Sequence, residues 1–136
     1  MIMMTRRDNW PDLLAMFIND RRSDPFAWAF NDCCIFAADW VNICTGTDYA
    51  EKWRGRYSTA IGARRFLDDA GGVEALVDSL GLDRITAQRA GRGDIVAQEA
   101  GRGITLGICL GVTTAFVAKT GLVFGPIENI QTSWRI

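Results

Sequence analysis

Cys33 is the residue with the clearest chemical potential in this sequence, because it lies where a loop meets the start of an expected helix. A helix N-terminus presents unpaired N–H groups and about half a positive charge, which together stabilise a thiolate. A thiolate is a nucleophile, so covalent catalysis is one interpretation of Cys33. The other interpretation is a small apolar side chain packed in the core. The 136 residues include no His, so a Cys–His pair cannot form within this chain.

The four cysteines do not predict a metal site. Cys33 and Cys44 would be separated by about 16 Å along one helix, at about 1.5 Å per residue, whereas metal–sulfur bonds are about 2.3 Å long. Cys33 and Cys34 would point about 100° apart, which makes them a poor chelating pair. A contact of Cys33 or Cys34 with Cys109 across a helix–sheet interface stays open. We therefore expect no metal, no cofactor and no disulfide.

The pattern of apolar residues predicts the elements that position Cys33. Helices are expected at 11–21, at about 33–44 with Asn31 or Asp32 as the cap, from Ser58 to Gly71, and from Val73 to Leu80. Short β-rich runs follow at 94–98, 104–110, 113–118, 122–127 and 130–135. Helices followed by strands with short links predict one α+β domain over residues 1–136 with an antiparallel sheet. Apolar side chains nearly surround the second helix, which predicts that it is central and buried.

The composition is that of a globular protein and excludes several classes. Apolar residues are 49% and charged residues 23%, and 15 basic against 16 acidic residues give a net charge of −1. A nucleic-acid binder would carry a basic excess, so no nucleic-acid partner is predicted. No run reaches the roughly 18 apolar residues of a membrane span, and the start lacks the apolar segment of a signal peptide. We expect synthesis in the cytoplasm, where the cysteines stay reduced.

A second candidate site is the stretch WRGRY at residues 53–57, which interleaves aromatic with basic side chains. Such a stretch can stack on a sugar or a base, or anchor a protein interface, while packing of its two rings in the core is the alternative. The candidate binding residues are Trp28, Asp32, Trp53, Arg54, Arg56 and Tyr57.

Three segments resemble motifs of the NlpC-type cysteine peptidases, papain-like enzymes that cleave peptidoglycan stem peptides. The Asp-Cys-Ser-Gly-Phe/Leu-Val box is similar to WAFNDCCIFA at residues 28–37, the Pro-Gly-Asp-Leu-Val strand to RGDIV at 92–96, and the His-Val-Gly-Ile-Tyr-Leu-Gly strand to TLGICLG at 105–111. The segments follow the family's order and cover about residues 26–118. The resemblance implies a papain-like NlpC-type fold. In that fold, N-terminal helices and a central Cys-bearing helix pack on a C-terminal, mostly antiparallel sheet of roughly four to six strands.

The resemblance assigns Cys33 to the nucleophile and Asp94 to a structural Asp before a strand. The family's His falls on Thr105, and a hydroxyl cannot activate a thiol as imidazole does. The third polar position would fall near Thr113 or Thr114. The match therefore implies the fold and argues against the family's usual activity, so whether the chain is an enzyme stays undecided.

Within this resemblance, the sequence is most similar to small phage and prophage proteins related to NlpC that are often encoded among tail genes. It implies a pseudoenzyme in the virion tail: a structural or assembly component of the tail tip that binds other tail-tip or hub proteins. The alternative is an active cysteine hydrolase of peptidoglycan stem peptides during genome delivery, with a base from a partner or a carboxylate. A third possibility is a cytoplasmic assembly factor absent from the virion. All three rest on family resemblance.

Overall fold

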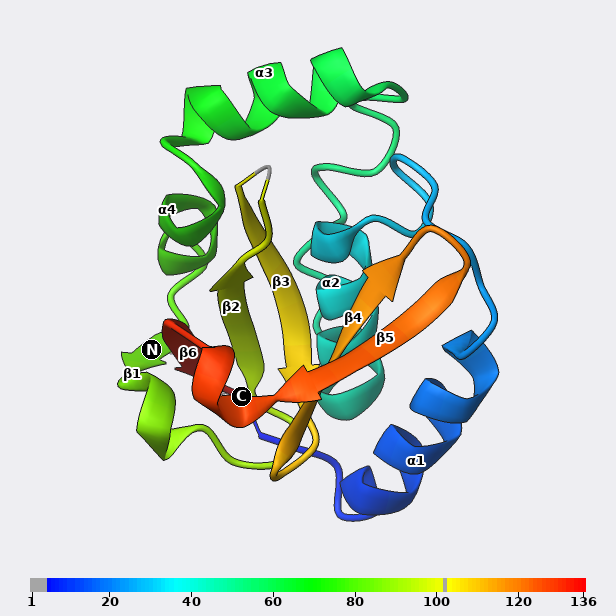
Figure 1. The fold of residues 1–136 in the computed structure, drawn as a ribbon, viewed down its shortest axis with the longest axis vertical. Coiled ribbons are helices and arrows are strands. Elements are labelled where there is room, and N and C mark those ends of the chain that lie inside the picture. Colours follow the sequence, from blue (N-terminus) through cyan, green and yellow to red (C-terminus); the bar gives the residue numbers. More distant parts are fainter. Residues whose placement is uncertain (1–4, 102) are drawn as a thin grey trace.

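The computed structural model describes residues 5–101 and 103–136 (Figure 1). Its helices are α1 (Trp10–Arg21), α2 (Cys33–Thr45), α3 (Ala60–Ala70) and α4 (Val73–Asp78). Its strands are β1 (Asp83–Ile85), β2 (Ile95–Glu99), β3 (Ile104–Cys109), β4 (Thr113–Ala118), β5 (Gly121–Pro126) and β6 (Thr132–Arg135). Two single-turn 3-10 helices, η1 (Ala87–Arg89) and η2 (Ile127–Asn129), complete it. Helices before strands confirm the predicted α+β class, and no helix of the described part has the length and apolar character needed to span a membrane.

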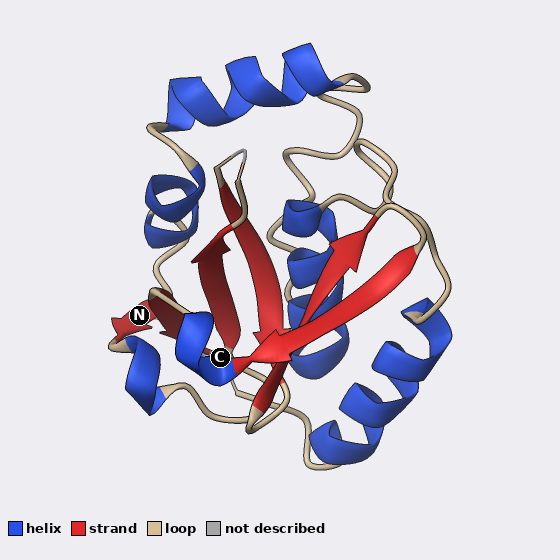
Figure 2. Cartoon of the chain, viewed as in Figure 1, coloured by secondary structure: helices blue, strands red, loops and turns tan. Residues whose placement is uncertain are grey.

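The six strands form one antiparallel sheet in the order β1-β6-β2-β3-β4-β5 (Figure 2). The order of the strands departs from chain order at one edge, because the last strand inserts between β1 and β2. Trp134 of β6 pairs with Arg84 on one side and with Ile95 on the other. The strand β1 was not predicted, since three residues are too short to show an alternating pattern.

Helix α2 packs on one face of the sheet and forms the centre of the core, as its apolar surface predicts. Its Ile35, Phe36 and Trp40 are fully buried. They belong to the same cluster as Leu106 of β3, while Cys109 of that strand belongs to a separate cluster under η1 and η2. Successive residues of a strand point to opposite faces, so Cys109 faces away from α2. The contact of Cys109 with Cys33 or Cys34 that the sequence left open is therefore not formed.

The ends of the helices follow local capping chemistry. Asp32 caps α2 by accepting a hydrogen bond from the Ile35 N–H, and Gly46 ends the helix in the left-handed conformation. The cap of α3 is Thr59 and not Ser58, because it is the Thr59 side chain that accepts from the Gly62 N–H. Adjacent hydroxyl residues offer equivalent caps, so the sequence pattern fixed this boundary only to within one residue.

A buried ion pair fastens the sheet to both ends of the described chain. The Asp94 carboxylate, which precedes β2, accepts from the Arg6 guanidinium at 2.8 Å, the Gly91 N–H at 2.8 Å and the Ile136 N–H at 3.1 Å. Arg6 also donates to the Ile136 carbonyl at 3.0 Å and lies over the Trp10 ring. Asp94 therefore has the structural role that the motif resemblance implies.

Strands β3 and β4 stay together at one end only. They pair through Ile108 with Ala115 and Cys109 with Thr114, and then diverge toward the N-terminal end of α2 (Figure 1). A side chain at Gly107 would lie 2.4 Å from the Ala115 carbonyl oxygen, so glycine permits the strands to come this close. The divergence leaves the first residue of α2 next to the start of β3.

Candidate functional site

Cys33 is the first residue of α2 and is partly exposed. Its pKa lies below the ordinary value, first because the Cys34 side chain hydrogen-bonds to it, and then because the Leu106 backbone and the Thr105 side chain do so too. Burial and the nearby charge of Asp32 act in the opposite direction. The net effect favours the thiolate, as expected for a nucleophile at a helix N-terminus.

Cys34 is the member of this pair whose thiol is harder to ionise. Its pKa is raised well above the ordinary value, first because its side chain bonds to Cys33 and second because it is buried. The thiol of Cys34 therefore stays protonated and supports negative charge on the Cys33 sulfur.

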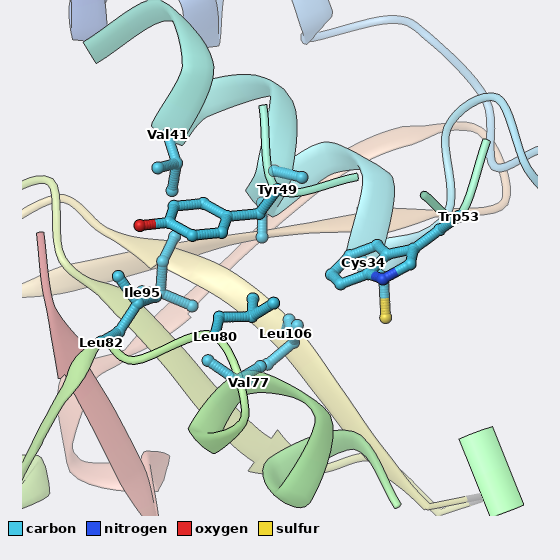
Figure 3. Close-up of a pocket in the computed structure, with 11 residues that line it drawn as sticks. Cys34, Val41, Tyr49, Trp53, Val77, Leu80, Leu82, Ile95 and Leu106 are labelled. Carbon is cyan, nitrogen blue, oxygen red and sulfur yellow. The ribbon is translucent and has the colours of Figure 1, made fainter. Parts of the chain in front are cut away.

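The Cys34 side chain faces an apolar cavity of about 20 Å³ between α2, α4 and the connector after α2 (Figure 3). Its lining consists of Cys34, Ala37, Ala38, Val41, Tyr49, Trp53, Val77, Leu80, Leu82, Ile95 and Leu106. A space of this size holds little more than one water, since about 10–15 Å³ is needed for each. It is a packing defect of the core and does not hold a substrate.

Thr105 lies against Cys33, at the position that the motif resemblance gives to an imidazole. On the neighbouring strand its direct partner is Gln98, whose Oε1 is buried and has no hydrogen-bond partner among the described residues. Thr114 donates to the Gly125 carbonyl at 3.2 Å and Thr113 is exposed. Within the described part of the chain, neither of these two threonines extends the pair of Cys33 and Thr105.

Asp32 fixes the geometry around Cys33 through both of its oxygens. Oδ1 accepts from the Ile35 N–H at 2.9 Å, and Oδ2 accepts from the Ala29 N–H at 2.9 Å and the Tyr57 hydroxyl at 2.6 Å. Burial, followed by the hydrogen bond to Asp32, raises the pKa of Tyr57, which keeps the phenol protonated as a donor. The carboxylate predicted as a binding residue is thus buried and occupied by three donors of its own chain.

The loop before Cys33 is held in a strained conformation that presents aromatic side chains. Ala29 has a φ of 69°, the left-handed region that a side chain disfavours, and a bridge between Ala27 and Asn31 closes the turn. Phe30 at its tip is 77% exposed and Trp28 is 37% exposed. Strain of this kind persists only where surrounding contacts impose it, and here the bond from Ala29 to Asp32 does so.

Ala29→Gly is expected to stabilise the protein by about 0.5 to 1 kcal/mol. The left-handed conformation costs a residue with a side chain about 1–2 kcal/mol, and the greater chain entropy of glycine when unfolded offsets about 0.4–1 kcal/mol of that gain. Urea unfolding followed by tryptophan fluorescence measures the change. Ala27→Gly in the same loop has no positive φ to relieve and is expected to destabilise, so equal effects of the two changes would contradict the interpretation.

Three of the remaining predicted binding residues lie in the connector after α2 and already contact other parts of the chain. The rings of Trp53 and Tyr57 are buried and pack near Phe66, with centroid distances of 6.2 and 5.6 Å, so stacking on a ligand would require the connector to open. Arg54 is committed to acidic side chains of its own chain, at 2.6 Å from Asp39 and 3.1 Å from Asp48.

Trp28 and Arg56 are the two predicted binding residues that remain on the surface, neither packed in the core nor held in an ion pair with a described residue. Trp28 makes an edge contact with Phe26 at 4.6 Å and remains 37% exposed, while Arg56 is exposed. Their role in binding stays a prediction.

The arrangement around Cys33 favours a thiolate, and the described residues that contact Cys33 include no imidazole. Neither Thr105 nor Cys34 can return a proton to an amide leaving group as an imidazolium does. Among residues 5–101 and 103–136, no group of three or more potential ligands is placed to hold a metal ion.

Sequence reasoning did not find the supporting contacts of the site. The contact of Cys34 with Cys33, the Leu106 backbone contact and the strained Ala29 all depend on tertiary placement. One feature of the sequence could have pointed to the neighbourhood of Thr105. Gln98 is a polar residue in an apolar strand, and it lies opposite Thr105 when the two strands are paired as a hairpin.

Comparisons with known proteins agree with this architecture. A family model described as "Domain of unknown function (DUF6950)" matches residues 5–136. No curated protein sequence is significantly similar to the chain. Among solved structures, the NlpC/p60 domain of the peptidoglycan hydrolase SagA superposes with a TM-score of 0.56 at 13% identity, covering 90% of this chain and 96% of that one. At this identity the likeness shows a shared fold, which confirms the NlpC-like, papain-like architecture expected from the sequence.

Proposed function

Since this chain belongs to the DUF6950 family and has the fold of an NlpC/p60 domain, we propose that it is a binding module of a phage tail tip built on a catalytically retired peptidase fold. One observation carries the proposal. Cys33 keeps the place and environment of a nucleophile, whereas the residue against it is Thr105 and the sequence has no His. The fold is retained while the proton-transfer group is missing.

Hydrolysis of an amide requires a base to activate the thiol and an acid to protonate the leaving nitrogen. General acid–base groups contribute about 10²–10⁴-fold to such reactions. Thr105 supplies neither function, and Asp32 is occupied by three donors. A domain without these groups can still function by binding a partner through its surface, because binding does not require amide hydrolysis.

The surface beside Cys33 has the features of a protein interface. Phe30 and Trp28 project from a loop that the Asp32 carboxylate and the bridge at Ala27 hold rigid. Exposed aromatic side chains are common interface anchors, and a rigid loop has little conformational entropy left to lose on binding. The assignment of the partners to other tail-tip or hub proteins rests on the motif resemblance.

A second candidate function is supported by the lowered pKa of Cys33. A thiolate that is partly exposed is prepared for attack, and a histidine from a partner chain could complete the site. The chain would then be a cysteine hydrolase of peptidoglycan stem peptides during genome delivery.

A fluorescent stem-peptide assay separates the two functions. The purified chain is expected to release no product, and its rate should equal that of Cys33→Ala, because the described site holds no group that can act as general acid. Cleavage that disappears in Cys33→Ala would overturn the proposal. Mass spectrometry of purified particles then tells a virion component from an assembly factor that leaves before maturation.

Cys33 is expected to react with iodoacetamide with a pH midpoint below that of a free cysteine thiol. The thiolate is the reactive form, and a lowered pKa means that it is present at lower pH. Rates of adduct formation measured by mass spectrometry between about pH 5 and pH 10 test this, with Cys33→Ser as the control. Burial raises the pKa of Cys44 and Cys109, so their labelling should be slower and shifted to higher pH. A midpoint at or above the free value would show that the thiol is not activated.

A further inference from the structure

A groove of about 340 Å³ lies between α1 and the turn that follows β3, at the opposite end of β3 from Thr105. Its lining residues are Leu14, Ala15, Ile18, Asn19, Arg22, Arg92 and Leu110. Leu14 and Ile18 form a buried apolar floor at 1% and 7% exposure, and the small side chain of Ala15 keeps the groove open. Ligand sites in proteins commonly measure about 300–1,000 Å³, so the groove has the size of a site.

Two positive charges that form no ion pair border this apolar floor, and the Arg22 guanidinium also lies over the Phe124 ring at 5.9 Å. Arg22 and Arg92 are exposed, and neither forms an ion pair with any described residue. Other arginines of the chain do form ion pairs, as Arg84 does with Glu74 and Asp78 at 2.9 Å. The groove lining itself contains no carboxylate. The groove is therefore complementary to an apolar group that carries negative charge.

We infer that this groove binds a segment of a partner protein in which an aliphatic side chain lies next to an Asp or Glu. The aliphatic side chain would cover Leu14, Ile18 and Leu110. The carboxylate would lie between the guanidinium groups of Arg22 and Arg92, since arginine binds carboxylates through paired hydrogen bonds. The inference does not depend on the state of Cys33.

The charges around the groove favour a protein segment over a membrane surface. Asp12 and Asp20 are exposed on α1 and Asp24 follows it, so the helix carries acidic groups beside its basic rim. An anionic bilayer presents a broad negative surface and would meet these carboxylates, whereas a single acidic side chain would meet only the arginines. The net charge of −1 points the same way.

An NMR titration with a defined probe tests the inference. The probe is an acetylated, amidated pentapeptide of leucine and glutamate in the order Leu-Glu-Leu-Leu-Glu, and its counterpart carries glutamine in place of glutamate. The acidic peptide is expected to shift the amide resonances of Leu14, Ile18 and Leu110. Replacing both arginines, Arg22→Gln with Arg92→Gln, should weaken binding about tenfold or more, since it removes both charged donors for the carboxylate.

Matched controls separate charge and shape from general effects. Arg65→Gln with Arg89→Gln removes two exposed arginines elsewhere and should leave the affinity unchanged. Ala15→Leu fills the groove without changing charge and should abolish the shifts, while Met16→Leu on the same helix should not. Cys33→Ala should bind like the parent chain, which keeps this test distinct from that of the proposed function.

Three outcomes would overturn the inference. Equal binding of the two peptides would remove the role of charge. The absence of shifts at the groove up to millimolar acidic peptide would remove the site. Binding to phosphatidylglycerol vesicles without binding to the peptide would replace the protein partner with a lipid surface.

Discussion

Thr105→His is expected to increase the rate of Cys33 alkylation at about pH 6 by roughly tenfold or more. Thr105 lies close enough to Cys33 to lower the pKa of its thiol, so an imidazole at this position is expected to lie within reach of the sulfur. Cys–His pairs exist as thiolate and imidazolium and lower the thiol pKa to about 3–4 in papain. The gain in thiolate exceeds the loss of intrinsic nucleophilicity that accompanies a lower pKa. The measurement is the pH profile of iodoacetamide labelling.

Two further variants control for this result. Thr105→Asn introduces a polar side chain without a titrating group, and its profile should stay close to that of the parent. Thr105→Val removes the hydroxyl donor to Cys33 and should move the midpoint upward. An unchanged profile for Thr105→His would show that residues 33 and 105 are not adjacent as they are in the structure. The interpretation that Thr105 occupies the position of the general base would then be wrong.

Asp94→Ala is expected to destabilise the fold by about 3–5 kcal/mol, the cost of removing one partner from a buried ion pair. The carboxylate is 4% exposed, and without it the buried N–H group of Ile136 would be left unpaired and the Gly91 N–H would lose its acceptor. Arg6 would lose its counter-charge as well. Urea denaturation monitored by tryptophan fluorescence should show a lower midpoint with an unchanged slope.

The ion pair of Arg64 and Asp68 supplies the matched comparison for Asp94. It joins two exposed side chains at 3.7 Å on α3, with 77% and 68% exposure. Asp68→Ala should therefore change stability by less than about 0.5 kcal/mol, as is usual for solvent-screened pairs. If the two alanine variants were equally stable, burial would not be the origin of the contribution of Asp94.

The sequence predicted the elements with strong local signals. The helix over 11–21 and the buried helix ending near Cys44 are present with nearly the predicted bounds, and the strand over 113–118 has them unchanged. The features that the sequence did not predict depend on contacts between segments that are distant along the chain. No local pattern shows that Trp134 pairs with Ile95 and Arg84, because the position of β6 is decided by which edges remain open once the other strands have paired.

The candidate site was predictable in part. The place of Cys33 at a helix start and its pairing with Thr105 follow from the motif order, and the structure brings both together. The burial of Trp53 and Tyr57 could not be decided from a stretch that alternates aromatic and basic residues. The strain at Ala29 could not be predicted, since nothing in an alanine indicates a positive φ.

The insertion of β6 between β1 and β2 has a consequence for how the protein is made. Until residues 132–135 have left the ribosome, β1 has no neighbour and the buried position of Trp134 is empty. Contacts of such large sequence separation form late and slowly, so this part of the nascent chain should remain open to proteases and chaperones until residues 132–135 have emerged and paired. Deletion of residues 132–136 would leave β1 and β2 without the strand between them and the core without Trp134.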